Sequence, residues 1–241
     1  MNLYKYASPT TFYPFAGKMI PWFAIPAAIL FAAGLYVGFF VAPTDFQQGD
    51  AYRIIFIHVP AAWMGMFLYV LMAIYAGIGW AFNARLSSMM ASAIAVTGAM
   101  FTLLSLVTGA FWGKPTWGTW WVWDARMTST LILLFLYAGF ISLQAAIEDP
   151  RRADRAGAVL ALVGVINVPI IYFSVQWWNT LHQGATIRIL GKPTMAAPML
   201  TAMLIMLAAC WLYSVAVVLS RLRCIILERE QNASRFAEVN A

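Results

Sequence analysis

The segment from Phe111 to Ser129 reads FWGKPTWGTWWVWDARMTS and lies between two long apolar segments. It holds five of the chain's eleven tryptophans, and an aspartate and an arginine follow closely: Trp112, Trp117, Trp120, Trp121, Trp123, Asp124 and Arg126. Indole combines an apolar ring with an N–H donor, so such a segment is expected at a membrane–water boundary. An aromatic belt needs only one or two anchors per helix end. The density therefore favours a platform for a large planar ligand.

The apolar segments on either side belong to a chain of 241 residues that is 63% hydrophobic and 10% charged. A soluble domain is only about 45–50% apolar, and a membrane-spanning helix needs about 20 predominantly apolar residues. Six windows without Asp, Glu, Lys or Arg meet this length: about Pro21–Ala42, Pro60–Phe82, Met89–Trp112, Met127–Ile147, Ala156–Gln176 and Met195–Leu219. We therefore predict an all-α polytopic membrane protein with six transmembrane helices.

The segments between these windows are short, and the sequence shows no clear internal repeat or linker. We therefore expect one domain over residues 1–241, with its tryptophan-rich segment at about 111–129. The first apolar window is not followed by a signal-peptide cleavage site, so we expect it to be retained as a helix.

Lys and Arg are distributed unequally between the two sides of the predicted bundle, which indicates its orientation. Ten lie on the side of the two termini: Lys5, Lys18, Arg85, Arg151, Arg152, Arg155, Arg221, Arg223, Arg229 and Arg235. Five lie on the other side: Arg53, Lys114, Arg126, Arg188 and Lys192. We expect both termini in the cytoplasm and the tryptophan-rich segment outside, in the periplasm of a Gram-negative cell. Scattered charges of this kind do not predict a nucleic-acid partner.

Only two histidines occur in the chain, and both fall on the predicted outer side. His58 precedes Pro60 at the mouth of the second span, where the helix dipole favours a neutral imidazole that can coordinate a metal. His182 follows the fifth span at a similar depth, so the two rings could converge. A single interfacial histidine is more often just a hydrogen-bonded polar side chain. Because both histidines lie on one side, a shared role as metal ligands is favoured over two separate hydrogen-bonded side chains.

The type of metal is limited by the number of ligands. A zinc site needs three or four protein ligands, and the two cysteines, Cys210 and Cys224, lie on the sixth span and its cytoplasmic end. Their separation of fourteen positions, about 21 Å along a helix, also excludes a disulfide. Haem iron needs only two axial ligands from the protein, so haem fits the two histidines better than zinc does.

Haem propionates need cationic partners, and five cations lie on the same side as the histidines: Arg53, Lys114, Arg126, Arg188 and Lys192. If residues 117–124 were helical, Trp117, Trp120, Trp121 and Asp124 would share one face. Two glycines and a proline in the segment disfavour that helix. Asp124 and Arg126 could equally pair with each other.

The string WGKPTWGTWWVWDARMTS resembles the signature of the WWD-domain proteins, which handle haem in cytochrome c maturation. The six-span plan, with His58 and His182 flanking this string, is similar to the six-span member of that family over nearly the whole chain. The resemblance implies a bacterial inner-membrane protein that holds non-covalent haem b at the periplasmic face. His58 and His182 would be the axial iron ligands, and the platform would consist of Trp112, Trp117, Trp120, Trp121, Trp123, Asp124 and Arg126.

The resemblance also implies partners. The haem would be delivered to a membrane-anchored periplasmic haem chaperone, within a complex of ATP-binding cassette transporter subunits and a small single-span subunit. No enzymatic step is expected on this chain. No cysteine lies on the haem side, and the acidic residues there (Asp45, Asp50 and Asp124) have no third histidine to act as a base.

Two other classes of function stay open on the residues alone. A small-molecule transporter would be expected to carry ionisable residues near the bilayer midplane, whereas these windows hold only neutral polar residues such as Ser105, Asn167 and Ser174. A single-haem, cytochrome b-like quinol oxidoreductase subunit would have a similar aromatic surface. A cytochrome b that conducts electrons across the bilayer through two haems would need four axial ligands, and two histidines exclude it.

Overall fold

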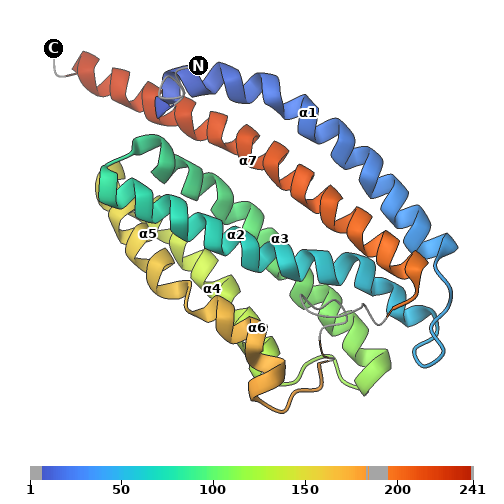
Figure 1. Ribbon diagram of the computed structural model, residues 1–241. Helices are drawn as coiled ribbons and strands as arrows, with labels where there is room; N and C mark the ends of the chain where they lie inside the picture. The colour runs from blue at the N-terminus through green and yellow to red at the C-terminus, as the bar shows by residue number, and fades with distance from the viewer. Residues whose placement is uncertain (1–6, 183, 185–194, 240–241) are drawn as a thin grey trace.

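The computed structural model describes residues 7–182, 184 and 195–239, with side chains through residue 230. Helices dominate this part of the chain (Figure 1). They are α1 (Pro9–Tyr36), the π-helical turn η2 (Val37–Val41), the 3-10 helix η3 (Asp50–Ile54), α2 (Ile55–Phe82), α3 (Arg85–Trp117), α4 (Ala125–Ala146), α5 (Pro150–Gly164), α6 (Asn167–Trp177) and α7 (Ala197–Val239).

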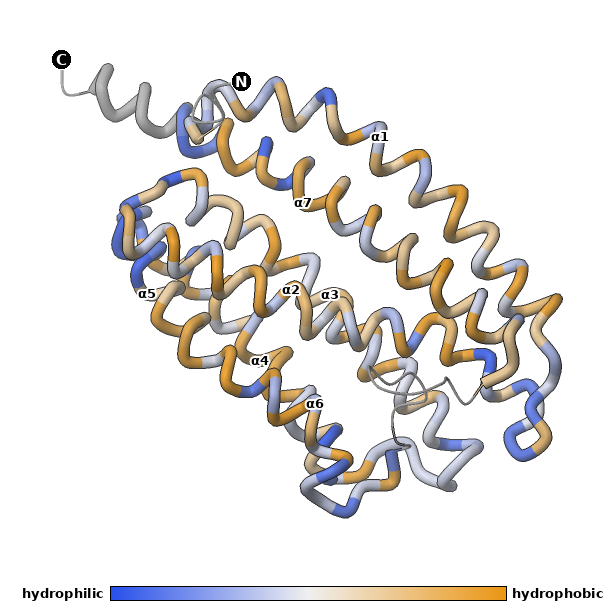
Figure 2. Tube along the Cα trace, viewed as in Figure 1, coloured by the Kyte–Doolittle hydropathy of each residue, from blue (hydrophilic) through white to orange (hydrophobic). Residues whose placement is uncertain are grey.

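Six helical stretches in the described residues are long and apolar enough to cross a membrane, which confirms the predicted all-α polytopic fold. Figure 2 shows apolar residues along the helices and hydrophilic residues gathered towards their two ends. Helix α1 packs along α7, and α2 packs along α3. Helices α4, α5 and α6 lie on the other side of α2 and α3 from α7 (Figure 1). Both cysteines are free and lie on α7, as predicted.

The helices extend beyond the predicted windows at several ends. The first begins at Pro9 rather than Pro21, because a proline is well suited to the first helical position and Pro14, Pro21 and Pro26 are accommodated inside it. The apolar windows marked the segment that fits the hydrocarbon core, not the ends of the helix. The second begins at Ile55 rather than Pro60, so Pro60 lies inside α2 and not in its first turn.

The fifth span is not the single helix predicted over Ala156–Gln176. It consists of α5 and α6, which are separated at residues 165–166. Pro169 lacks the N–H that would donate to the carbonyl four residues earlier, and its ring crowds that carbonyl, so the helix is interrupted there. The buried Asn167 donates from Nδ2 to the Ser129 carbonyl of α4 at 2.8 Å, which fastens the start of α6 to α4.

Close contacts between helices depend on small residues at two points on α2 and α3. The buried Tyr137 hydroxyl of α4 donates to the Gly65 carbonyl of α2 at 2.9 Å. The same ring lies against Gly98 of α3, where an added Cβ would overlap it. These contacts fix α4 against the α2–α3 pair and thereby position the residues at the start of α4 beside the ends of α2 and α3.

Candidate functional site

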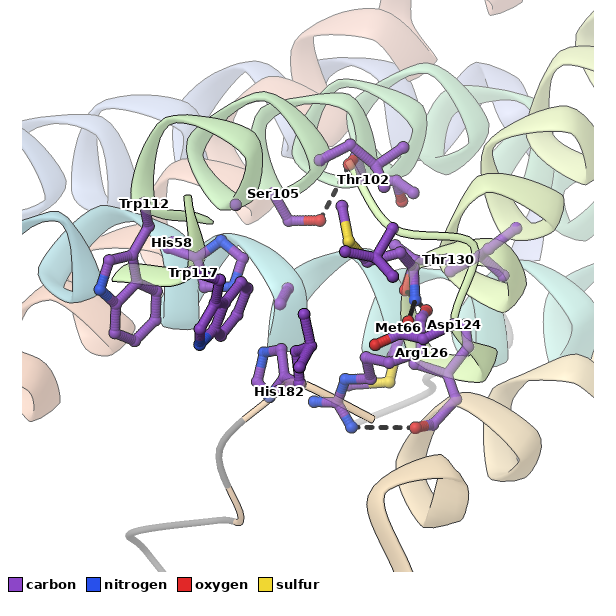
Figure 3. Close-up of a pocket in the computed structure, with 18 residues that line it drawn as sticks. His58, Met66, Thr102, Ser105, Trp112, Trp117, Asp124, Arg126, Thr130 and His182 are labelled. Atoms are coloured by element: carbon purple, nitrogen blue, oxygen red, sulfur yellow. Dashed lines mark hydrogen bonds between the residues drawn. The ribbon is translucent and has the colours of Figure 1, made fainter. Parts of the chain in front are cut away.

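A cavity opens between α2, α3, α4, α6 and the segment that follows α6 (Figure 3). Its empty volume is about 750 Å³, which includes space open to solvent. Six of the predicted site residues line it: His58, Trp112, Trp117, Asp124, Arg126 and His182. Residues from four separate parts of the sequence therefore meet at one site.

His58 is the fourth residue of α2, and its ring is almost fully buried, with 9% of the residue exposed. Its Nδ1 lies 3.1 Å from the Thr108 hydroxyl of α3. The ring also has an edge-to-face contact with Trp112, with centroids 5.6 Å apart and planes at 69°. His58 is therefore held in a defined orientation by α3.

His182 approaches His58 from the segment that follows α6. The two imidazole centroids are 6.2 Å apart, and their planes are inclined by 35°. Two imidazoles that bind one iron from opposite faces, each nitrogen about 2 Å from the metal, have ring centres about 6 Å apart. The spacing therefore suits a pair of axial ligands. Within the described residues no three His, Cys, Asp or Glu side chains are grouped as a zinc site would require.

The tryptophan-rich segment divides into two parts at Gly118. Helix α3 continues through Trp117, so Gly113 and Pro115 are helical. Gly118 then adopts φ +79°, a left-handed conformation typical of a helix C-terminus. Residues 118–124 are not helical, so the alternative in which Trp117–Asp124 form one helical face is wrong. The positive φ, which glycine tolerates readily, ends the helix at that point.

Trp112 and Trp117, both on α3, line the cavity. Trp112 is buried, and its Nε1 donates to Gln48 Oε1 at 2.8 Å, which ties the α1–α2 connection to the site. Trp117 has its ring centroid 6.4 Å from that of His182. The two indoles thus flank the two histidines.

Trp120, Trp121 and Trp123 lie outside the cavity lining. Trp120 is half exposed and packs edge-to-face on Phe111 with centroids 5.5 Å apart. Trp123 is 75% exposed and packs on Trp121. The Trp121 Nε1 is buried without a hydrogen-bond acceptor among the described residues. The five tryptophans of the predicted platform are therefore divided: Trp112 and Trp117 form cavity walls, and the other three form a separate group outside the cavity.

Asp124 and Arg126 have different partners at the start of α4. The Asp124 carboxylate caps the helix by accepting from the Met127 backbone N–H at 2.8 Å. The Arg126 Nη1 donates to the Ile171 carbonyl of α6 at 2.9 Å. Among the described side chains these two form no salt bridge with each other, so the alternative that they simply pair is not supported. Both face the cavity, and Arg126 supplies it with a cationic donor (Figure 3).

Of the other predicted cations, Arg53 and Lys114 are described and do not line the cavity. Arg53 donates from Nη1 to the Gly38 and Ala42 carbonyls at 2.8 and 3.0 Å and pairs with Asp50 at 2.9 Å. It therefore fastens the η2 turn to η3. Lys114 donates to the Gly118 carbonyl at 3.1 Å. Arg188 and Lys192 lie outside the described residues.

Sequence reasoning did not single out Thr108, Gly109 or Gln48, although each contacts His58 or Trp112. The sequence did contain one signal for Thr108 and Gly109. Ser105, Thr108, Gly109 and Trp112 follow a spacing of three, four and seven, which places small and polar residues on the same helical face as a tryptophan. Gln48 carried no comparable signal, since it lies 64 positions from its partner.

A family model described as Heme exporter protein C matches residues 2–237. The chain belongs to the heme exporter protein C family. The "Heme exporter protein C" of Escherichia coli (strain K12) is 45% identical over 239 residues, which is 99% of this chain and 96% of the relative. The protein of the same name from Bradyrhizobium diazoefficiens is 46% identical over 229 residues, covering 95% and 87% of the two chains.

A further relative of this family comes from Marchantia polymorpha, the "Putative cytochrome c biosynthesis ccmC-like mitochondrial protein". It is 49% identical over 162 residues, which is 67% of this chain and 68% of the relative. The match of the family model over almost the whole chain confirms the resemblance drawn from the tryptophan-rich segment.

Proposed function

We propose that this member of the heme exporter protein C family binds haem between His58 and His182 and passes it to a membrane-anchored haem chaperone during cytochrome c maturation. The observation that carries the proposal is the 6.2 Å spacing of the two imidazole centroids beside a cavity walled by Trp112 and Trp117. Haem would be cargo, bound as non-covalent haem b, and no residue would do covalent chemistry on it.

Arg126 is the cation best placed to bind a haem propionate. It lines the cavity, and within the described part of the chain its Nη1 donates to the Ile171 carbonyl while its other guanidinium N–H donors remain for a carboxylate. Arg53 is less suitable because it does not line the cavity, and its Nη1 and Nε already donate to two carbonyls and Asp50. By binding a propionate, Arg126 would therefore orient the haem within the cavity.

The exposed tryptophans favour a role in docking rather than in enclosing haem. Trp120 and Trp123 are 51% and 75% exposed and lie next to the cavity residue Asp124 in the sequence. Exposed aromatic residues are typical anchors of protein–protein interfaces. This surface would receive the periplasmic chaperone, so that the haem and its acceptor lie on the same side of the membrane.

The proposed orientation has both termini in the cytoplasm and the haem cavity at the periplasmic face of a bacterial inner membrane. It rests on the excess of Lys and Arg on the terminal side, ten against five. The protein would work with ATP-binding cassette transporter subunits and a small single-span subunit. Since haem has to leave, the chain acts as a relay rather than as an enzyme or an electron carrier.

A transfer assay tests this proposal. The purified protein is loaded with haem, the purified chaperone is added, and haem is followed by absorption spectrum and on a denaturing gel, with transporter subunits and ATP supplied. We expect stoichiometric transfer to the chaperone, and less transfer from a Trp120→Ala, Trp123→Ala variant that still binds haem. Haem that stays on this chain through many redox cycles while the chaperone stays empty would contradict it.

A further inference from the structure

One face of α3 contacts the His58 ring at three points. Thr108, Gly109 and Trp112 occupy this face, and all three lie against the imidazole. The hydrogen bond between Nδ1 and the Thr108 hydroxyl is buried, so water does not compete with it. The direction of this bond decides which ring nitrogen is available to a metal.

The direction follows from the other partners of the Thr108 hydroxyl. Its oxygen lies 2.6 Å from the Leu104 carbonyl and 3.2 Å from the Ser105 carbonyl. Carbonyl oxygens only accept, so the single hydroxyl hydrogen is donated to them, and the shorter contact is to Leu104. Towards His58 the hydroxyl therefore presents a lone pair. His58 has to donate, which places its hydrogen on Nδ1 and leaves Nε2 with a free lone pair.

We propose that Thr108 is a positioning residue that fixes His58 in the Nδ1–H tautomer, so that Nε2 binds the haem iron. This inference rests on the proposed function and deepens it by naming what prepares one of the two ligands. Histidines that bind metals commonly donate their second N–H to a protein acceptor, which orients the ring and strengthens its ligand nitrogen. Here the acceptor is the Thr108 hydroxyl, whose one hydrogen is already donated to the Leu104 carbonyl of the same helix.

Gly109 and Trp112 complete the arrangement by limiting the movement of the ring. A Cβ added at Gly109 would lie 3.1 Å from His58 Cε1, so the imidazole packs directly on the helix backbone. Trp112 covers a second side with its ring centroid 5.6 Å away, and Gln48 fixes that indole through a 2.8 Å hydrogen bond. The ring is therefore held in one orientation, with Nδ1 engaged and Nε2 as the nitrogen that remains for iron.

A Thr108→Val variant tests the inference because valine keeps the shape of threonine and removes the hydroxyl. Losing an outer partner of a metal-binding histidine typically weakens metal binding by 10- to 100-fold. We expect a loss of about tenfold in ferric haem affinity, since a hydroxyl is a weaker partner than a carboxylate. If the ferrous affinity is unchanged, that tenfold loss raises the haem midpoint potential by about 59 mV.

Two further variants of Thr108 and a control make the result interpretable. Thr108→Ser keeps the acceptor and should restore both affinity and potential. Thr108→Cys replaces the hydroxyl by a weak acceptor and should give an intermediate shift, which provides a readout if the valine variant does not fold. Thr97→Val makes the same change on α3 at a buried hydroxyl that has no hydrogen-bond partner among the described residues, and should leave the haem spectrum and potential unchanged.

The outcomes separate this inference from the proposed function. A folded Thr108→Val or Thr108→Cys variant with wild-type affinity and potential would overturn the role of Thr108 while haem binding by His58 stands. A Thr108→Ser variant as impaired as Thr108→Val would also overturn it, because packing rather than the acceptor would then matter. If His58→Ala left haem binding unchanged, the proposed function and this inference would both fail.

Discussion

Substituting Gly109 by alanine should weaken haem binding without weakening the fold. An alanine Cβ would lie 3.1 Å from His58 Cε1 and 3.6 Å from Nδ1, so the imidazole has to move by a few tenths of an ångström. That movement strains the ring, at about 0.5–1.5 kcal/mol, and weakens its hydrogen bond to Thr108, at about 0.5–1.5 kcal/mol. Together these effects correspond to roughly 5- to 150-fold weaker haem binding.

The same substitution should cost the haem-free protein little stability, because without iron the His58 ring is free to shift away from the added Cβ. Alanine is favoured over glycine inside a helix by about 1 kcal/mol, and Gly109 lies within α3. Haem affinity would be measured by titrating purified protein in detergent, and apo stability by thermal unfolding. Gly77→Ala is a matched control on α2, where the added Cβ would meet only a flexible methyl end of Leu162 at 3.3 Å. Unchanged haem affinity in the folded Gly109→Ala variant would refute the reasoning.

Three other predictions concern the cavity, the surface and the orientation. Arg126→Gln should weaken haem binding by about tenfold, because a charge-assisted hydrogen bond of about 1.5 kcal/mol is lost. The absorption bands set by the axial ligands should stay in place, and displaced bands would mean that Arg126 acts on the iron ligands instead. Trp120→Ala with Trp123→Ala should reduce transfer to the chaperone more than haem binding, and an equal loss of both would argue against a docking surface. In intact cells, an impermeant thiol reagent added from outside should label Thr116→Cys but not Ser234→Cys, and the reverse pattern would contradict the orientation.

The spans and the approximate position of the site were predictable from the sequence because they depend on local composition. Windows of about 20 apolar residues predict helices through a bilayer whatever their neighbours are. The concentration of tryptophans before Asp124 likewise marked the region in which the candidate cavity lies. The interruption of the fifth span was also readable, since Pro169 lies inside the predicted helix and cannot donate to a carbonyl one turn earlier.

The contacts that define the cavity could not be predicted in the same way. The hydrogen bond between His58 and Thr108 joins residues 50 positions apart, and that between Trp112 and Gln48 joins residues 64 positions apart. Both depend on the relative rotation and depth of neighbouring helices, which hydrophobic periodicity does not fix when a helix is apolar on all sides. The division of the tryptophans at Gly118 depends in turn on where α3 ends.

The most direct test of the account is the absorption and electron paramagnetic resonance spectrum of the purified protein with ferric haem, compared with His58→Ala and His182→Ala. The two imidazole centroids lie 6.2 Å apart, the spacing of two ligands on one iron. We therefore expect six-coordinate, low-spin haem in the wild-type protein and five-coordinate, high-spin haem in each variant. Low-spin spectra that are identical in all three proteins would contradict the assignment of these histidines as the iron ligands.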